Sequence, residues 1–306
     1  MNNILISITG PTGIGKTKLA VLLAQHFNTE IISADSRQFY KEMTIGTAVP
    51  TKEELAAAPH HFVQHLSIED SYSVGDFERD VIKKLEQLFQ TKECIVMVGG
   101  SGLYCDAVIF GLDKFPDVDS NIRRDLNNAL KDNGIASLQK KLALLDPEYY
   151  EIVDHNNPHR LIRALEICIG TGKPYSSFLN KKKPKRNFKV LNVGLTGDRN
   201  IIYDRINARV DIMIDEGLVE EAKKLLPFKE LNALQTVGYK ELFKYFEGTF
   251  DLDFAIAEIK KNTRRFAKRQ ITWFKKSQNT LWLNFDYQKQ EAIQQIEEKI
   301  SELKNE

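Results

Sequence analysis

The residues GPTGIGKT at 10–17 have the spacing G-x-x-x-x-G-K-T, which is typical of a loop that binds phosphate groups. They follow the apolar run ILISIT and precede the helical pattern KLAVLLAQHF. A glycine-rich turn between a strand and a helix presents backbone N–H groups to an anion, and the helix dipole adds to the attraction. Lys16 can reach a terminal phosphate, and Thr17 can hold Mg²⁺ as a cofactor. The sequence therefore predicts a phosphate-binding site, with an ordinary surface turn as the alternative.

The carboxylate that a phosphoryl-transferring enzyme of this class places at the end of a later strand is missing from that position. The best later strand, CIVMVGGSGLY, ends in glycines and Ser101, and its first carboxylate, Asp106, falls on the following helix pattern. Asp35 instead ends the second strand pattern, in IISADSRQFY. Because parallel strands converge at their carboxyl ends, we expect Asp35, Ser101 and Lys16 to share a pocket. That pocket can hold a departing diphosphate while the carboxylate takes a proton from a nucleophile.

The elements that must position these residues follow the pattern of a parallel sheet wrapped by helices. Short β-branched runs alternate with helical patterns over the first 110 residues, and strand signals return at 189–195 and 281–285. We expect an α/β fold with a P-loop NTPase-like parallel sheet core and helices on both faces. Between the two sets of strands the pattern is helical and polar. The prediction is a discontinuous catalytic core, 1–111 and 188–306, with a helical insertion domain at 112–187 that ends in the linker-like KKKPKR.

Composition and charge limit the possible partners. The net charge of +1 means that any nucleic-acid partner must be met by local basic patches. The three cysteines have no C-x-x-C spacing, which argues against a disulfide framework or a zinc module and fits a cytoplasmic protein. The apolar run at the N-terminus is short and lacks a basic region before it, so it indicates a buried strand. We expect no membrane association, and a monomer.

Besides the phosphate loop, the chain contains the blocks ADSRQFY, MTIGTAVP, APHHFV, YSVGDFERD, VGGSGLY, NNPHRLIRALEI, IYDRINARVDIM, QTVGYKEL and TRRFAKRQITWF, in this order. With these blocks the chain resembles the tRNA dimethylallyltransferases, also called tRNA isopentenyltransferases, of the bacterial type. The likeness runs from about Leu5 to Phe274. The resemblance implies transfer of a dimethylallyl group from dimethylallyl diphosphate to N6 of adenosine 37, directly 3′ of the anticodon, in tRNAs that read codons beginning with U. The implied partners are the tRNA anticodon stem-loop and dimethylallyl diphosphate.

The resemblance also implies roles for particular residues. Asp35 is the general base for the weakly nucleophilic adenine amine, with a turn cap as the alternative reading. Lys16, Ser101 and Arg123 stabilise the departing diphosphate, although the sequence alone reads Arg123 as a solvated helix charge. Ile14 stands where many relatives have serine, so diphosphate affinity could be altered. The full set of implied diphosphate-binding residues is Gly10, Pro11, Thr12, Gly13, Ile14, Gly15, Lys16, Thr17 and Arg205.

The RNA must extrude the target base to bring it into a pocket. The run KKNTRRFAKRQITWFKK at 260–276 has eight basic residues and no acid, which favours contact with phosphates, and Lys261 falls on its basic face. We interpret Phe266, Trp273 and Phe274 as core residues rather than stacking platforms. Leu161, Ile162 and Leu165 are also expected in a core. The residues implied in tRNA binding are Asp35, Ser36, Arg37, Gln38, His159, Arg160, Arg163, Gly238, Lys240, Arg265, Lys268 and Arg269.

Three alternatives remain open from the sequence. A P-loop kinase acting on a small molecule would turn over nucleotide, but the strand-end acid is missing and the basic helix is unexplained. An RNA-binding protein that has lost catalysis would be expected to lack part of the set formed by Lys16, Asp35 and Ser101, which is complete here. An adenylate dimethylallyltransferase would use a free nucleotide in place of tRNA. The insertion at 112–187 and the basic helix at 260–276 favour tRNA over a free nucleotide. A metal site at His60, His61 and His65 is disfavoured.

Overall fold

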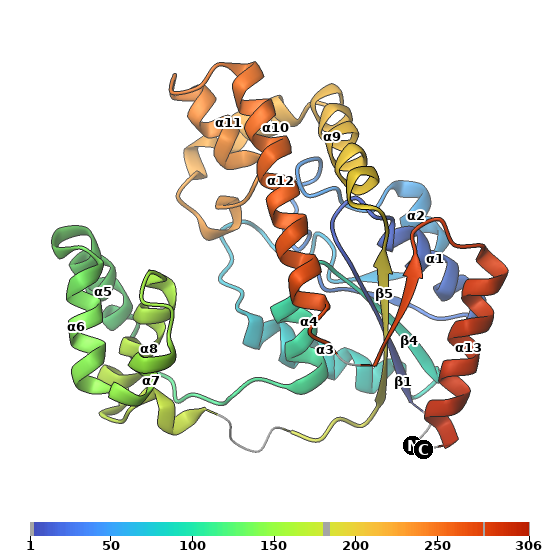
Figure 1. Cartoon of the computed structure of the whole chain (residues 1–306), viewed down its shortest axis with the longest axis horizontal. Coiled ribbons are helices and arrows are strands. Elements are labelled where there is room, and N and C mark those ends of the chain that lie inside the picture. The colour runs from blue at the N-terminus through green and yellow to red at the C-terminus, as the bar shows by residue number, and fades with distance from the viewer. Residues whose placement is uncertain (1–2, 180–183, 278, 306) are drawn as a thin grey trace. The chain divides into compact units, whose positions relative to one another are not determined.

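A computed structural model, drawn in Figure 1, describes residues 3–179, 184–277 and 279–305. The chain divides into two compact units. The core unit comprises Met1–Ile109 and Arg186–Glu306, and the insertion unit comprises Phe110–Lys185. The sequence placed the insertion at 112–187. Part of the linker-like KKKPKR run, 181–183, lies outside the described residues.

The core unit is built on a parallel sheet of six strands, in the order β3-β2-β4-β1-β5-β6. The strands are β1 (Ile4–Thr9), β2 (Ile31–Ser33), β3 (His60–His61), β4 (Cys94–Val98), β5 (Lys189–Thr196) and β6 (Thr280–Asn284). In the register of the central strand, Ile4 lies opposite Cys94 on one side and Lys189 on the other. The expected α/β class and parallel sheet are confirmed. Strand β3 was not expected, because two residues are too few to produce a strand pattern.

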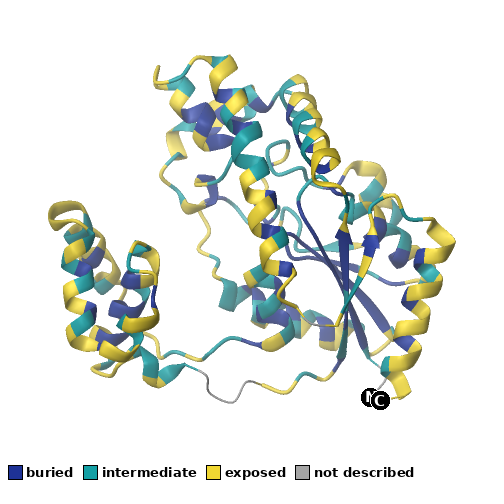
Figure 2. Ribbon diagram, viewed as in Figure 1, coloured by how far each residue is buried: buried dark blue, intermediate teal, exposed yellow. Residues whose placement is uncertain are grey.

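Helices cover both faces of this sheet, and the strands between them are buried (Figures 1 and 2). Because side chains alternate along a strand, Ile4, Ile6 and Ile8 pack into one hydrophobic cluster and Leu5 into another. The first cluster includes residues of α1 (Lys16–His26) and α13 (Lys289–Asn305). The second includes residues of α3 (Val74–Leu88), α4 (Gly102–Phe110), α10 (Leu218–Leu225), α11 (Tyr239–Phe246) and α12 (Leu252–Phe274). The remaining helices of this unit are α2 (Lys52–Ala57) and α9 (Arg199–Asp215).

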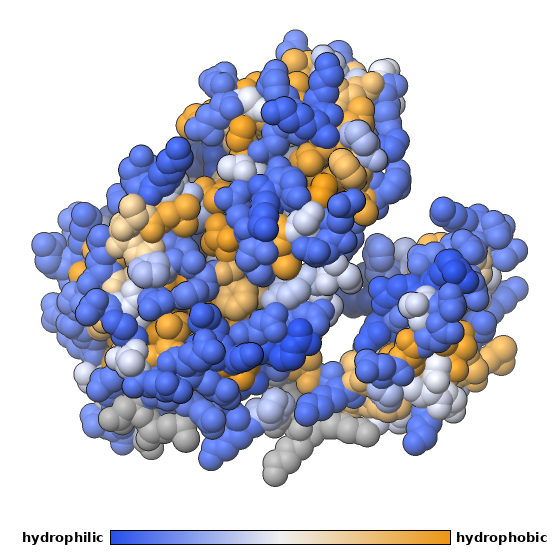
Figure 3. Space-filling view, turned by 180° about the vertical axis from the view of Figure 1, so that it is seen from behind, coloured by the Kyte–Doolittle hydropathy of each residue, from blue (hydrophilic) through white to orange (hydrophobic). Residues whose placement is uncertain are grey.

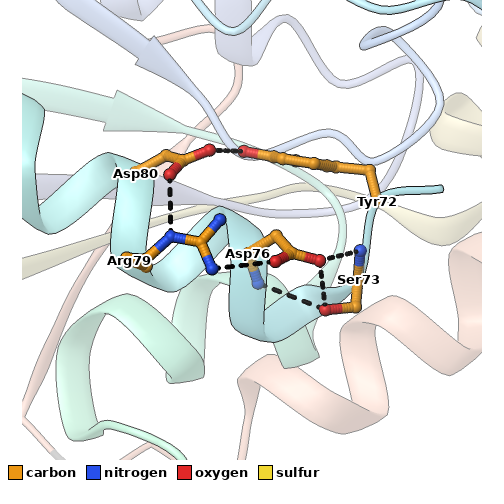
Figure 4. A network of polar contacts seen from close by, with 5 residues as sticks. All are labelled: Tyr72, Ser73, Asp76, Arg79 and Asp80. Atoms are coloured by element: carbon orange, nitrogen blue, oxygen red, sulfur yellow. Dashed lines mark hydrogen bonds and ion pairs between the residues drawn. The ribbon is translucent and has the colours of Figure 1, made fainter. Parts of the chain in front are cut away.

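A polar network fixes the start of α3, and Figure 4 shows its members: Tyr72, Ser73, Asp76, Arg79 and Asp80. Ser73 Oγ accepts a hydrogen bond from the Asp76 N–H at 3.2 Å, and the Asp76 carboxylate accepts one from the Ser73 N–H at 2.9 Å. This reciprocal capping box satisfies two N–H groups at the helix end. The Tyr72 hydroxyl donates to Asp80 at 3.1 Å, and the Tyr72 ring meets Phe39 edge-on. The YSVGDFERD block therefore supports the chain just after residues 35–38.

The insertion unit has a hydrophobic cluster of its own. Its helices are α5 (Ser120–Asn133), α6 (Ile135–Leu145), α7 (Pro147–Ile152) and α8 (Pro158–Thr171). Leu161, Ile162 and Leu165 of α8 are buried with Leu126 and Leu142, so their predicted place in a helix core is confirmed. Asn157 caps α8, with Pro158 at its first position. The unit therefore rests on helix packing rather than on the sheet.

None of the helices within the described residues combines the length and apolar character that crossing a bilayer requires. The face shown in Figure 3 is largely hydrophilic, with hydrophobic residues gathered in small groups.

Candidate active site

The phosphate loop joins the end of β1 to the start of α1. Gly10, Gly13 and Gly15 have φ values of 150°, 78° and 104°. At Gly10 a Cβ atom would lie 2.9 Å from the carbonyl oxygen of Leu195, so β5 leaves no room for a side chain there. No side chain caps the start of α1. Its first N–H groups therefore face the loop as an anion-binding end.

The side chain of Ile14, inside the phosphate loop, packs into the hydrophobic core. It is 1% exposed and belongs to the hydrophobic cluster that includes Leu19 and Ile206. The interpretation that a hydroxyl is missing from the phosphate contacts is therefore wrong for this side chain, and Ile14 can offer only its backbone to an anion. A larger apolar residue fits here because the position is part of the core.

Ile14→Ser, which restores the commoner residue, should lower the free energy of unfolding by about 2 to 5 kcal/mol, because it removes buried apolar volume and buries a hydroxyl. The KM for dimethylallyl diphosphate should stay within about threefold of the original value. Urea unfolding and steady-state kinetics measure the two quantities. A clear fall in that KM would show that the hydroxyl does reach the diphosphate.

A cavity of about 820 Å³ opens at the carboxyl ends of the central strands. Asp35 and Ser36, which follow β2, line it together with Ser101, which follows β4. Ser101 Oγ lies 3.2 Å from Ser36 Oγ and accepts the Ser36 N–H at 3.3 Å. A Cβ at Gly100 would lie 3.9 Å from Lys16 Nζ, which places the Lys16 ammonium beside the same loop. Strand topology thus brings the carboxylate, the hydroxyl and the ammonium to one end of the sheet.

Three charged side chains interact at this end of the sheet, and two of them, Asp35 and Arg209, line the cavity. Burial lowers the pKa of Lys16 to about 8, and the Asp35 carboxylate partly offsets the effect while Arg209 adds to it. Burial also lowers the pKa of Arg209, again opposed by Asp35. Arg209 lines the cavity and was not singled out in the sequence. A signal was available, because Arg209 follows Arg205 by four residues and so lies on the same side of α9.

Arg205 lies against the phosphate loop. Its Nε donates to the carbonyl oxygen of Gly13 at 2.9 Å, and its guanidinium stands over the Phe285 ring at 5.3 Å. These contacts hold a positive charge at the outer side of the loop.

The segment 35–38 is tied into the protein by its polar groups. Asp35 Oδ1 accepts the Arg37 N–H at 3.1 Å, so this carboxylate does cap a turn, as the alternative reading held. The Arg37 guanidinium donates to the carbonyls of Asn232 and Ala233 at 2.8 and 2.9 Å. The Gln38 amide donates to the carbonyls of the 47–48 turn at 3.2 and 2.9 Å. The side chains of Arg37 and Gln38 thus make protein contacts in this structure.

Helix α12 connects the two sides of the cavity through Gln270, which the sequence analysis missed. The buried Gln270 accepts the Thr12 N–H at 2.9 Å and donates to the Gly100 carbonyl at 2.8 Å. One amide therefore holds the phosphate loop and the loop before Ser101 in register. A lone glutamine in a helix gives no sequence signal for this role.

Two aromatic residues of α12 are not in the core. Phe266 and Trp273 are 38% and 39% exposed and line the cavity, so their prediction as core residues is wrong, whereas Phe274 is buried as predicted. The Trp273 indole donates to Asp106 at 2.9 Å, and its ring covers Gly102. Helical spacing could not separate a core face from a cavity face.

The basic residues of α12 divide into paired and exposed groups. Lys261, expected on the basic face, forms an ion pair with Glu258, and Lys260 pairs with Asp211. The side chains of Arg265, Lys268 and Arg269 are exposed, and Arg269 lines the cavity. Gly238 and Lys240 at the start of α11 line it as well.

The candidate residues of the insertion unit form their own cluster. Arg123 donates to both carboxylate oxygens of Glu166, from Nε at 3.1 Å and from a terminal nitrogen at 2.8 Å. Arg163 donates to the same carboxylate at 2.9 Å and lies over the Phe115 ring at 5.1 Å. The hydrogen bonds and charges of the two arginines hold the pKa of Glu166 below its usual value despite burial. His159 and Arg160, at the start of α8, are exposed.

The histidines near β3 have other uses than metal binding. His61 pairs with Glu30 at 2.6 Å, His60 contacts the Ala58 carbonyl at 2.8 Å, and His65 packs among aromatic rings. Over 3–179, 184–277 and 279–305, no group of three or more histidine, cysteine or acidic side chains could hold a metal ion.

Comparison with known proteins assigns this arrangement of residues to a family. The sequence profile of the family described as IPP transferase matches residues 38–277. A protein of Christiangramia forsetii named tRNA dimethylallyltransferase is 65% identical over 301 residues, which covers 98% of this chain and 100% of the relative. A protein of Flavobacterium johnsoniae with the same name is 55% identical, covering 97% and 98%.

Two solved structures share the fold. The full-length tRNA isopentenylpyrophosphate transferase of Bacillus halodurans has a TM-score of 0.71 and 38% identity, covering 99% of this chain and 100% of that one. A eukaryotic dimethylallyltransferase acting on tRNA has a TM-score of 0.76 and 27% identity, covering 92% and 74%.

Proposed function

We propose, from the premise that this chain belongs to the IPP transferase family, that its cavity transfers a dimethylallyl group from dimethylallyl diphosphate to N6 of adenosine 37 in tRNA. The chain is a tRNA prenyltransferase. Within that activity we propose three details. The donor is dimethylallyl diphosphate, the target base is adenosine 37, and the substrates are tRNAs that read codons beginning with U.

The reaction needs a base for the N6 proton and positive groups that stabilise the departing diphosphate, and we propose that residues in and beside the cavity supply both. A bond forms between N6 of adenine and the first carbon of the allyl group, while the bond from that carbon to the diphosphate oxygen breaks. The proton leaving N6 goes to the Asp35 carboxylate, and the electron pair of the broken bond leaves with diphosphate. General-base help of this kind contributes about 10²- to 10⁴-fold.

The negative charge that grows on diphosphate falls among positive groups. Thr12 of the phosphate loop, Arg209 and Ser101 line the cavity, and the Lys16 ammonium lies beside Gly100, which also lines it. Arg205 adds charge on the far side of the loop. Donors arranged before the reaction stabilise the departing group without reorganisation. We assign Arg123 to the same task from the insertion unit, where Glu166 fixes its guanidinium.

The residues near the phosphate loop fit a Mg²⁺ ion that is bound mainly by the diphosphate of the substrate. This ion prefers oxygen ligands and usually keeps several waters while it binds one or two protein groups and the phosphates. The Thr17 hydroxyl, at the first turn of α1, is such a group, and the described residues hold no cluster of three or more metal-binding side chains. We propose that Thr17 holds Mg²⁺ with diphosphate, where the ion would neutralise part of the charge on the leaving group.

The RNA would be bound by basic side chains of α12 and of the insertion unit. Arg265, Lys268 and Arg269 would supply charge for phosphates, as would the exposed Arg160 on α8. On the same helix His159 would offer a ring nitrogen, and the half-buried Arg163 would act while paired with Glu166. A cavity of about 820 Å³ is in the range that holds a small ligand. An extruded adenine beside the allyl group would meet Asp35, Ser36 and Arg37 on one wall and Gly238 and Lys240 on another, with Gln38 supporting the first wall through the 47–48 turn.

The single observation that carries the proposal is the position of Asp35. It lines the cavity beside the cationic groups that would hold a diphosphate, and it comes from the strand after the phosphate loop rather than from a later one. A carboxylate placed there accepts a proton from a nucleophile in the cavity. We also propose that the chain works as a cytoplasmic monomer, which light scattering of the purified protein would check.

Incubation of the purified protein with Mg²⁺, dimethylallyl diphosphate and unmodified tRNA carrying the A36-A37-A38 sequence should add one dimethylallyl group to adenosine. Nucleoside mass analysis detects the product, and a matched tRNA with guanosine at position 37 should stay unmodified. A parallel tube replaces dimethylallyl diphosphate with ATP. Turnover of ATP without prenylation in the first tube would contradict the proposal and favour phosphoryl transfer.

A further inference from the structure

A carboxylate of α10 holds a loop that no part of the proposed mechanism explains. Glu221 Oε2 accepts the N–H groups of Thr44 and Ile45 at 3.0 and 2.9 Å. Glu221 Oε1 accepts the Gly46 N–H at 2.9 Å and the Tyr239 hydroxyl at 2.7 Å. One side chain thus receives four hydrogen bonds, three of them from consecutive residues of one turn. Hydrogen bonds to an ionised group are stronger than those between neutral groups.

Tyr239 closes the same loop from the other side. Its side chain is fully buried, and burial together with the Glu221 charge raises its pKa, so the hydroxyl stays protonated and donates. A Cβ at Gly46 would lie 2.6 Å from the Tyr239 ring and hydroxyl. The turn therefore packs against the Tyr239 ring at Gly46 and is hydrogen-bonded to the Glu221 carboxylate of α10. These two contacts together restrict the position of the turn.

The loop held in this way is part of the cavity wall next to Asp35. Gly46, Thr47 and Ala48 line the cavity, and the Gln38 amide donates to the Thr47 and Ala48 carbonyls at 3.2 and 2.9 Å. The chain of contacts runs from Glu221 to the 44–48 turn and from there to the segment that carries Asp35. The phosphate loop is anchored elsewhere, through Gln270 and Arg205. The two sides of the cavity thus have different anchors, and they meet where Ser36 contacts Ser101.

We infer that Glu221 is a positioning residue that, with Tyr239, fixes the base-binding side of the cavity, whereas Gln270 and Arg205 fix the phosphate loop on the diphosphate side. This inference rests on the proposed function, because it names which substrate each side receives. Glu221 is not among the residues that line the cavity, and it acts through the 44–48 turn and Gln38. A role confined to folding stability would predict equal effects on both substrates.

Glu221→Gln tests the inference, because the amide keeps the size of the side chain but turns an N–H donor toward donors of the loop. We expect kcat/KM for tRNA to fall at least tenfold, while KM for dimethylallyl diphosphate at saturating tRNA stays within about twofold. Tyr239→Phe, which removes one of the four hydrogen bonds, should have a smaller effect of the same kind. The exposed neighbour variant Glu220→Gln is the matched control and should behave as the unchanged chain.

Gly46→Ala approaches the loop from the opposite side and leaves Glu221 in place. Its methyl group meets the Tyr239 ring, so the turn must shift, and the same selective loss for tRNA is expected. If Glu221→Gln does not fold, Gly46→Ala and Tyr239→Phe decide the question. Equal losses for the two substrates, or tRNA kinetics unchanged in folded variants, would overturn the inference. An unchanged chain that does not prenylate tRNA at all would instead refute the proposed function.

Discussion

Asp35→Asn should lower kcat for tRNA prenylation by about 10²- to 10⁴-fold, because the amide cannot accept the proton that leaves N6 of adenine. The substitution is nearly isosteric. It also keeps an oxygen that can accept the Arg37 N–H, which Asp35 Oδ1 accepts at 3.1 Å. The turn that begins the 35–38 segment is therefore retained, and the KM for tRNA should change little. Single-turnover prenylation with both substrates bound measures the chemical step directly.

The comparison with Asp35→Ala separates the two roles that this carboxylate plays in the structure. If proton transfer is its main task, asparagine and alanine lower the rate to a similar level, and only alanine also weakens tRNA binding. If capping the turn is its main task, asparagine behaves as the unchanged chain and alanine alone is impaired. The second result would remove Asp35 as the base.

Lys16→Met should lower kcat/KM for dimethylallyl diphosphate by about 10²- to 10³-fold, because it removes a positive charge aimed at the leaving group. Lys18→Met, at an exposed position two residues along the same helix, is the matched control and should leave this ratio unchanged. Lys16→Arg keeps the charge but presents a wider group in a tight loop, so an intermediate value is expected.

The same lysine predicts a pH dependence. Since burial lowers the pKa of Lys16 to about 8, the free protein loses this charge as the pH rises through that value. The ratio kcat/KM for dimethylallyl diphosphate should therefore fall above pH 8, by at most about tenfold for each pH unit, until it reaches the level of Lys16→Met. Well below pH 8 the ammonium is almost fully charged, so no loss from this group is expected there. The alkaline fall should be absent in Lys16→Met and in Lys16→Arg, and its persistence in both would assign it to another group.

Sequence patterns predicted the sheet because its central strands are buried on both faces and so form continuous apolar runs. They also indicated the phosphate loop, whose glycines have a local cause in backbone conformation. They did not reveal Gln270 or Arg209. Gln270 becomes informative only when folding brings it to the Thr12 N–H, which lies 258 residues away in the chain. Local periodicity holds no information about such contacts.

The wrong predictions for the aromatic residues of α12 and for Ile14 have the same physical origin. Phe266 and Trp273 follow a helical spacing typical of a core, but the side of α12 that they occupy borders a cavity. Ile14 was read as a phosphate contact because it lies inside the loop motif, but its side chain turns into the core. In both cases the sequence gives the residue type, whereas the direction of the side chain depends on what packs beside it.

The central strand β1 precedes the insertion unit in the chain, yet its neighbour β5 begins at Lys189, beyond that unit. During synthesis β1 can pair with β4 but must leave its other edge open until the insertion unit has left the ribosome. Closing so long a connection costs chain entropy, although each doubling of a loop adds only about 0.6 kcal/mol. If the insertion unit folds first around its own hydrophobic cluster, the segment between β4 and β5 is already compact when β5 pairs with β1. The pairing of these two strands then does not require the closure of a long disordered loop. The order of folding would then be local helices first and the middle of the sheet last.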